Sequence, residues 1–269
     1  MRPSSKLVAL LVSLVCTGAV QAGGKLSLAN VRSTYGVNGP VRDDAKYLPG
    51  DRIDLSFDIT NITVDPKSGL AKWKMVMEVF DDKKPKSIFS KETPNEMVVV
   101  LGGRRLPAYC FVSMGLDQPP GKYTLRVTVT DEANKATTKH DHPFVVGEKA
   151  FGIVGLMAQP IGLTSQTSGA RFDVVGMKRD GKNSFDLKVS MRIYDEKNQP
   201  TLQQPLASEF PKDLPSMVEP EKLNTLPVAF PIELTRPGRF RVELEATDNL
   251  AKTTKKLSYT LNVLDSAGK

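Results

Sequence analysis

The sequence predicts an all-β protein built from two tandem β-sandwich domains, and two observations lead to this prediction. Apolar and polar residues alternate with a period of two over many short segments, with no convincing long amphipathic helix between them. The segment PGKYTLRVTVTD at residues 120–131 also returns 117 residues later as PGRFRVELEATD, at residues 237–248. A repeat of this length indicates two copies of one β domain rather than one large enzyme.

The first 22 residues have the pattern of a signal peptide. Arg2 and Lys6 precede an apolar run at residues 7–12, and Val20 and Ala22 occupy the −3 and −1 positions of a cleavage site. The apolar run is too short to span a bilayer as a helix, which takes about 20 residues. We therefore expect cleavage after residue 22 and an exported product of the periplasm or cell surface, with no integral membrane segment.

The mature chain is weakly basic and keeps one cysteine. Loss of Arg2 and Lys6 lowers the net charge from +7 to +5, which gives no case for a nucleic-acid partner. Cys16 leaves with the signal peptide; its lipidation is the alternative, disfavoured because no small residue directly precedes it. Cys110 then has no partner for an intrachain disulfide, and domains of about 120 residues bury an adequate core without one.

Strand patterns of the first copy recur in the second. Residues 53–59 alternate apolar and polar side chains, which indicates a strand with one buried face. The next strand places Trp73, Met75 and Met77 on one face, where they could line a pocket. Because residues 187–193 repeat this pattern with apolar residues in the second copy, we interpret all three as core residues.

Each copy has about seven short strands separated by turn residues, which suits a sandwich of two sheets. Residues 110–116 and 228–234 alternate and should form the strand before each Pro-Gly turn. The middle segments, residues 84–107 and 199–227, are rich in Pro and polar residues and are predicted to form edge strands and loops. The predicted domains cover residues 23–147 and 150–264.

Several segments resemble a known class of domain. GKYTLRVTVTD at residues 121–131 resembles the penultimate strand of bacterial immunoglobulin-like and fibronectin-type-III-like modules. PGDRIDL at residues 49–55 is similar to their second strand, and Trp73 falls where immunoglobulin-like folds often keep a core tryptophan. The resemblance covers nearly the whole mature chain. It implies two tandem immunoglobulin-like β-sandwich domains and specifies no ligand.

Two histidines and a cysteine are candidates for chemistry. His140 and His142 should point to the same face of a strand, where they could share one metal ion. The repeat aligns them with Leu257 and Tyr259, so we interpret both as packing residues. Cys110 shares its strand face with apolar neighbours, which indicates a packed thiol rather than a nucleophile.

A basic loop is the candidate site for a partner. Gly102 and Gly103 suit a tight hairpin, which would present Arg104 and Arg105 at or beside its tip. A double arginine could bind an acidic glycan, a carboxylate or an anionic surface. A solvated loop is the alternative interpretation. These four residues are the predicted partner-binding loop.

The sequence contains none of the common catalytic motifs: no Gly-x-Ser-x-Gly elbow, no phosphate-binding glycine loop and no His-Glu-x-x-His helix. Some acidic residues could bind calcium at loop ends but lack the Asp-x-Asp-x-Asp spacing of a calcium loop: Asp43, Asp44, Asp65, Asp81 and Asp82. We expect no enzymatic activity and no cofactor.

We therefore expect a non-catalytic exported module that binds a protein or another envelope component, or has a structural role. Recognition would use loops or an unpaired sheet edge, by strand addition. One alternative is a periplasmic chaperone of two immunoglobulin-like domains, although the domains of such chaperones are not close repeats. Another is an accessory glycan-binding protein, which a row of exposed aromatic residues would favour. The function should lie where the copies differ, in residues 84–107 and 199–227.

Overall fold

The computed structural model describes residues 24–266 and confirms the all-β prediction. Within that range, regular structure consists of β-strands and one short 3-10 helix, η1 (Pro220–Lys222). No helix among these residues is long and apolar enough to cross a membrane. The predicted signal peptide, residues 1–22, lies outside the described residues.

The first half of the chain forms two sheets that pack face to face around one apolar core. One sheet has the strand order β1-β3-β6 and the other the order β2-β8-β7-β4-β5. The strands are β1 (Ser27–Thr34), β2 (Lys46–Tyr47), β3 (Arg52–Thr60), β4 (Leu70–Asp81), β5 (Ser87–Val98), β6 (Arg105–Ser113), β7 (Gly121–Asp131) and β8 (Thr137–Val146).

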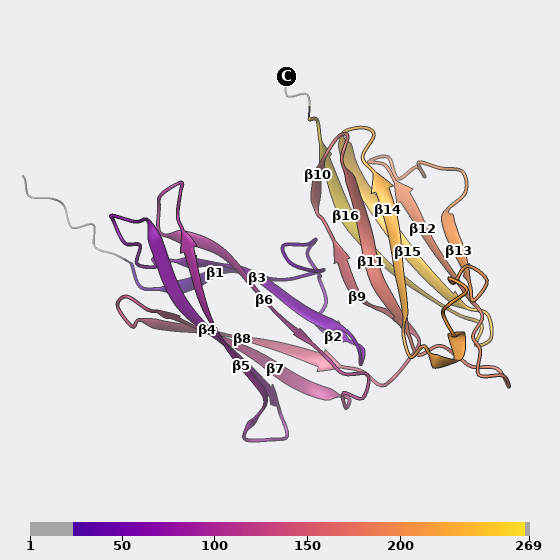
Figure 1. The fold of residues 1–269 in the computed structure, drawn as a ribbon, viewed down its shortest axis with the longest axis horizontal. Helices are drawn as coiled ribbons and strands as arrows, with labels where there is room; N and C mark the ends of the chain where they lie inside the picture. Colours follow the sequence, from indigo (N-terminus) through magenta and orange to yellow (C-terminus); the bar gives the residue numbers. More distant parts are fainter. Residues whose placement is uncertain (1–23, 267–269) are drawn as a thin grey trace, which may run out of the picture.

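The second half repeats this arrangement strand for strand (Figure 1). Its sheets have the orders β9-β11-β14 and β10-β16-β15-β12-β13, so each strand corresponds to the one eight numbers earlier. The strands are β9 (Gly152–Ala158), β10 (Ile161–Leu163), β11 (Thr167–Val175), β12 (Leu187–Tyr194), β13 (Leu206–Phe210), β14 (Leu226–Glu233), β15 (Gly238–Asp248) and β16 (Thr253–Leu264). The two sandwiches lie side by side, with the strands of the second nearly upright in Figure 1.

Strand registers agree with the repeat that is visible in the sequence. His140 of β8 lies opposite Val127 of β7, and Leu257 of β16 lies opposite Leu244 of β15. Because Val127 and Leu244 occupy the same place in the repeated segment, His140 and Leu257 are structurally equivalent. Residues of the two domains can therefore be compared position by position.

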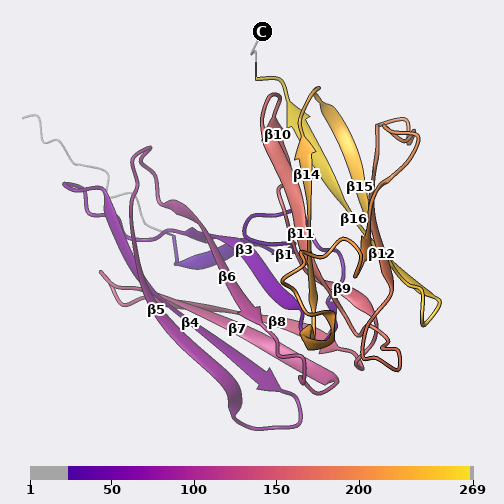
Figure 2. The ribbon, with the colours of Figure 1, turned by 45° about the vertical axis from the view of Figure 1, so that its right-hand side comes forward.

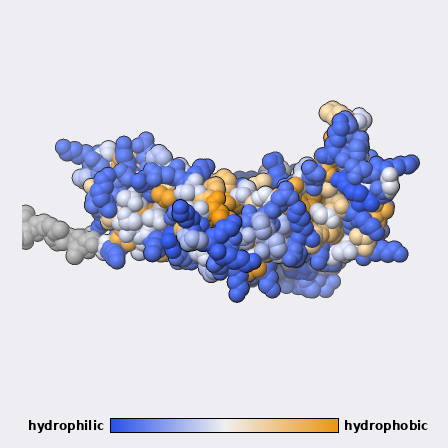
Figure 3. All heavy atoms as spheres, turned by 90° about the horizontal axis from the view of Figure 1, so that it is seen from below, coloured by the Kyte–Doolittle hydropathy of each residue, from blue (hydrophilic) through white to orange (hydrophobic). Residues whose placement is uncertain are grey.

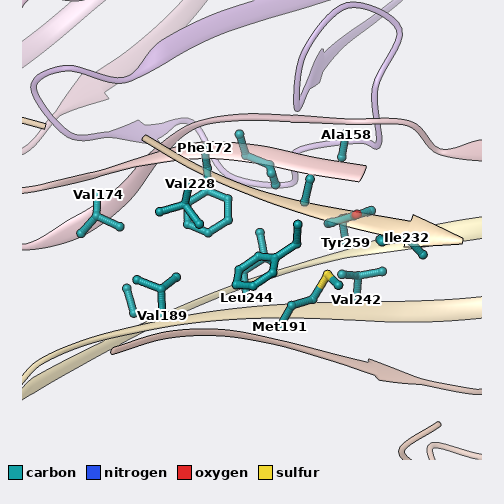
Figure 4. Packing of buried hydrophobic residues seen from close by; sticks show 14 of the residues in the cluster. Ala158, Phe172, Val174, Val189, Met191, Val228, Ile232, Val242, Leu244 and Tyr259 are labelled. Carbon is teal, nitrogen blue, oxygen red and sulfur yellow. The ribbon is translucent and has the colours of Figure 1, made fainter. Parts of the chain in front are cut away.

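Period-2 alternation fills each core from both sheets. In the second domain, Phe172 and Val228 from one sheet lie across from Met191 and Leu244 of the other, and all four are buried (Figure 4). The inward face of each strand supplies every second residue, which is why the alternating segments of the sequence are the strands of the structure. In the first domain, the strand predicted at residues 110–116 ends sooner, at Ser113.

A buried aspartate connects the two sheets in each domain. Asp131, at the end of β7, is fully buried and accepts a hydrogen bond from Thr63 N–H (2.8 Å) in the loop after β3. Asp248, at the end of β15, is also fully buried and accepts one from Lys178 N–H (2.7 Å) in the loop after β11. Both carboxylates also accept a bond from their own turn. The repeat thus keeps one charged connection per domain between opposite sheets.

A third buried aspartate connects the two domains. Asp51 is 3% exposed and accepts hydrogen bonds from Arg42 Nη1 (2.9 Å) and from the N–H of Gly155 in β9 (2.8 Å). Gly155 has a positive φ of 62° and lies at a β-bulge, which turns its N–H out of the sheet toward the first domain. Strands β3 and β9 approach one another at this place, and Figure 2 shows the sheet with β1 and β3 on the side of the first domain that lies next to the second domain.

We predict that Asp131→Ala and Asp248→Ala each lower the stability of their own domain by about 3 kcal/mol, because each leaves buried N–H groups without an acceptor. Urea unfolding followed by tryptophan fluorescence reports the first domain alone, since Trp73 is the one tryptophan of the chain. The urea midpoint measured by fluorescence should fall for Asp131→Ala and change little for Asp248→Ala. The unfolding transition measured by circular dichroism should move to lower urea concentration in both variants. Asp117→Ala, at a side chain that is 94% exposed, is the control. Unchanged midpoints in both variants would contradict this role.

Candidate functional site

A groove opens along one side of the first domain, between its two sheets. It has a volume of about 300 Å³. Trp73, Met75 and Met77 of β4 form its floor, and its walls come from residues 91–97 of β5 and 107–111 of β6. Both β5 and β6 are the last strands of their sheets, so within residues 24–266 no further strand pairs with either. We call this feature the β5–β6 groove.

The β6 wall is built from smaller residues than its counterpart in the second domain. The equal registers of the β3–β6 and β11–β14 pairs align Ala108 with Val228 and Cys110 with Phe230. Val228 and Phe230 are both buried in the core of the second domain. The first domain therefore has less side-chain volume at the same two positions.

The β5 wall is more polar than its counterpart. Asn95 of β5 lies opposite Trp73 of β4, just as Phe210 lies opposite Leu187, the residue equivalent to Trp73. Asn95 and Phe210 are therefore equivalent. By the same comparison Lys91 is equivalent to Leu206. Phe210 packs on the core of the second domain, whereas Asn95 lines the open groove. Across both walls, four positions that are apolar and large in the second domain are small or polar in the first.

The second domain also covers this side with its own chain. Leu214 and Leu223, in the connection 211–225 between β13 and β14, pack on the core. Arg179 donates hydrogen bonds to two backbone carbonyls of this connection, one at 2.8 Å, and so holds it in place. The segment with η1 lies at the lower end of the second domain in Figure 1. The corresponding connection of the first domain, 99–104, is much shorter.

The outer edge of β6 has free backbone donors and acceptors. Pro107 has no N–H, so it must occupy a ladder position whose N–H would face away from β3. Because this direction alternates along an antiparallel ladder, Tyr109, Phe111 and Ser113 also direct their N–H and C=O groups away from β3. The next residue after Ser113 shows the alternation directly: Met114 directs its N–H toward the β3 side and donates to the carbonyl of Asp51 (2.9 Å).

The equivalent edge of β14 has fewer donors. Pro227 and Pro231 occupy the places of Pro107 and Phe111. The second proline removes an N–H from the middle of the edge, which is a common protection against pairing with another strand. The edge of β6 keeps this donor, so the two domains differ in the backbone as well as in side-chain volume.

Trp73 leaves an unpaired donor at the floor of the groove. The side chain is 6% exposed, and its indole N–H has no acceptor among the described residues. A buried donor without a partner costs about 1–3 kcal/mol. The equivalent residue in the second domain, Leu187, has no polar side-chain atom. The floor of the groove thus offers a hydrogen bond that a bound group can accept.

Apolar side chains are exposed around the groove. Met97, Tyr109 and Phe111 are 41%, 45% and 40% exposed. Val100 and Leu101, in the crossover between β5 and β6, are 83% and 99% exposed. The face drawn in Figure 3 is mostly hydrophilic, with hydrophobic residues in small patches.

The predicted partner-binding loop lies in this crossover, but it is not a hairpin. Gly102 and Gly103, with φ of 72° and 90°, connect strands of different sheets. Arg104 donates hydrogen bonds to two backbone carbonyls after β3 (3.2 and 3.3 Å), and Arg105 pairs with Asp58. The predicted hairpin is therefore wrong, and both guanidinium groups bind their own domain. That these residues contact a partner stays a prediction.

The two histidines face the core side of β8 and are half-buried. Their rings lie 6.4 Å apart, and His142 Nε2 is 3.1 Å from Ser33 Oγ. Burial, together with the nearby His140, lowers the pKa of His142 below its usual value. Their equivalents, Leu257 and Tyr259, also point toward the core. The histidines pack as the alignment predicts.

Cys110 and three of the acidic loop residues, Asp44, Asp65 and Asp81, take part in local structure. Cys110 is 2% exposed, and burial, with the charge of Asp54, raises the pKa of its thiol to about 12. Asp65 accepts two backbone N–H groups of its own turn, which lowers its pKa. Asp44 pairs with Arg42. Among residues 24–266, no group of three or more His, Cys, Asp or Glu side chains is arranged to hold a metal ion.

The solved structures to which the chain is similar include distant ones with low sequence identity. No protein-family model and no curated protein matches the sequence. Latent dimeric PorU from Porphyromonas gingivalis is similar over 94% of this chain at 10% identity, with a TM-score of 0.39. Escherichia coli alpha-2-macroglobulin activated by porcine elastase is similar over 90% at 10% identity, with a TM-score of 0.30. The chain spans 21% and 22% of those two chains.

A superoxide reductase (neelaredoxin) from Ignicoccus hospitalis is similar over 40% of this chain and 78% of its own, at 18% identity and a TM-score of 0.27. None of these similarities bears on the function of the chain. The candidate site therefore rests on the geometry of the groove and on the comparison between the two domains.

We predict that Cys110 reacts slowly in the folded protein although it lines the groove. At pH 8, a pKa of about 12 in place of 9 lowers the thiolate population on the order of 1,000-fold. Iodoacetamide labelling followed by mass spectrometry should show little modification in buffer and complete modification in urea. Rapid labelling of the folded protein would contradict the packed position of this thiol.

We predict that His142 makes the first domain less stable below neutral pH. Because the pKa of His142 is lowered in the folded state, the unfolded chain binds the proton first as the pH falls below about 6.5. Stability should therefore rise with pH through the window just below 6.5. His142→Tyr copies the second domain and should flatten this dependence in urea unfolding between pH 5.5 and 7. The prediction is contradicted if the free energy of unfolding changes with pH by the same slope in the wild-type protein and in His142→Tyr.

Proposed function

We propose that the protein is a non-catalytic exported module that binds another protein through the β5–β6 groove of its first domain. One observation carries the proposal. At the same place in two otherwise equivalent domains, the groove is open in the first and filled by Val228, Phe230 and Phe210 in the second. The fold does not require the opening, since the second domain has the same strand order without it.

The composition of the groove favours a protein partner. Burial of apolar surface stabilises a complex by roughly 25 cal/mol per Å² before the costs of association. Aromatic residues and methionine are enriched where proteins contact one another, and Met97, Tyr109 and Phe111 are exposed at the rim. Trp73, Met75 and Met77 make the floor of the groove apolar, whereas its β5 wall is polar and includes Glu96, which pairs with Lys72.

The proposal includes three further properties: the protein is exported, it has no catalytic activity, and its two domains are immunoglobulin-like. Residues 1–22 have the pattern of a cleaved signal peptide. The candidate nucleophile Cys110 is a packed thiol with a raised pKa, which supports a binding role. Each domain has a strand of two or three residues parallel to its last strand, and this arrangement supports the immunoglobulin-like resemblance.

Site-specific cross-linking tests the proposal. A photoreactive amino acid would replace Tyr109 at the groove, or Ala229, the equivalent residue of β14, as the matched control. After irradiation of intact cells, we expect a discrete protein adduct from position 109 and none from position 229. Filling the groove with Cys110→Phe, which copies Phe230, should reduce the adduct at least 10-fold because it occupies the space that the partner needs.

A second filling variant guards against misfolding. Asn95→Phe copies Phe210 and fills the groove from the β5 wall instead. Circular dichroism and Trp73 fluorescence identify which variants keep the folded first domain. Equal adducts from both positions, or an adduct that survives both folded filling variants, would refute the proposed function.

A further inference from the structure

We propose that the partner contributes an extended segment that adds as a strand to the free edge of β6. Its apolar side chains, at every second position, would enter the β5–β6 groove, and an acidic side chain would pair with Lys91. This inference rests on the proposed function and specifies the kind of polypeptide that the groove binds.

The backbone of β6 supplies the first part of the argument. Tyr109, Phe111 and Ser113 direct successive N–H groups away from β3, at a spacing of about 7 Å for every second residue. Their carbonyls face the same way, so the edge offers an alternating row of donors and acceptors. Only another extended chain satisfies such a row along its length, because a helix uses its backbone groups internally.

The side chains of the groove supply the second part. Ala108 and Cys110 are two residues apart on the inward face of β6, and both are smaller than their counterparts in the second domain. A strand paired with β6 directs every second side chain to this same face of the sheet. Two apolar side chains at positions i and i+2 of the added strand would therefore pack beside Ala108 and Cys110.

Charge and hydrogen-bonding groups supply the third part. Lys91, on the inward face of β5, makes no ion pair among the described residues, whereas Glu92 and Glu96 of the same strand pair with Lys74 and Lys72. An acidic side chain on the partner is the complement of this lysine. Trp73 adds a buried indole N–H that lacks an acceptor. A polar oxygen on the partner would satisfy it.

A second copy of the same chain is a poorer occupant. If β6 paired with β6 of another copy, it would bring the sequence RLPAYCFVS, which contains no acidic residue to meet Lys91. It would also bring Pro107, which lacks a donor for the shared edge. We therefore assign the edge to a different polypeptide with alternating apolar residues and at least one Asp or Glu.

Two variants of one residue separate backbone pairing from side-chain contact. Phe111→Pro copies Pro231 and removes an outward N–H without loss of a β3–β6 hydrogen bond. Phe111→Ala removes the same aromatic ring, which lies against Arg52, but keeps the N–H. Tyr109→Pro, at the next outward position, serves as a second blocking variant if Phe111→Pro does not fold.

The probe is a phage-displayed library of random 12-residue peptides, selected on the purified two-domain protein. Enriched peptides should show apolar residues at i, i+2 and i+4 together with an acidic residue. Their affinity should fall at least 10-fold more for Phe111→Pro than for Phe111→Ala, because only the proline also removes the outward N–H. Lys91→Glu should weaken the acidic peptides several-fold.

The outcomes distinguish the inference from the proposed function. If the groove-dependent adduct at position 109 forms but peptides lack a period of two, or bind Phe111→Pro as tightly as Phe111→Ala, the inference is overturned and the proposed function stands. Failure of any peptide to bind also overturns it. A dimer in sedimentation that is lost in Phe111→Pro would assign the edge to a second copy instead. Equal adducts from positions 109 and 229 would refute both the inference and the proposed function.

Discussion

The unequal strand numbers of its two sheets determine where each sandwich is incomplete. Three strands face five, and on one side β5 and β6 both end their sheets without a further partner. Any such side exposes the interior between the sheets and the backbone of two edges. The second domain meets this constraint with Phe230, Phe210 and a covering connection, and the first domain does not. The difference between the copies is thus located where the fold itself is least complete.

The features that the copies share belong to the stability of the fold. Asp131 and Asp248 occupy the same place at the end of equivalent strands and bind equivalent loops of the opposite sheet. Because a buried carboxylate is costly unless it is fully hydrogen-bonded, retention of both indicates that this connection is required in each domain. Asp51 has no such duplicate, since its hydrogen bond to Gly155 joins one domain to the other.

The alternating pattern and the repeat predicted the strands with one buried face. They did not predict the bulged strands, the shortest strands or the crossover between the sheets. β1 and β9 each contain a bulge, and the extra residue shifts the alternating pattern by one. β2 and β10, with two and three residues, are too short to show a period. The paired glycines at residues 102–103 indicated a turn, yet only the sheet order shows that this turn crosses between sheets. The groove depends on two edges that sequence alone does not bring together.

The comparison between domains does contain a sequence signal for the groove, once the register is known. Ala108 and Cys110 align with Val228 and Phe230, so the first copy has lost, or never gained, volume at two core positions. It also buries the indole N–H of Trp73 without an acceptor, at a cost of about 1–3 kcal/mol. The second copy has neither feature at the equivalent positions, where Val228 and Phe230 fill the core and Leu187 replaces Trp73. An open, partly unsatisfied groove beside an unprotected strand edge is therefore best explained by an occupant that completes it.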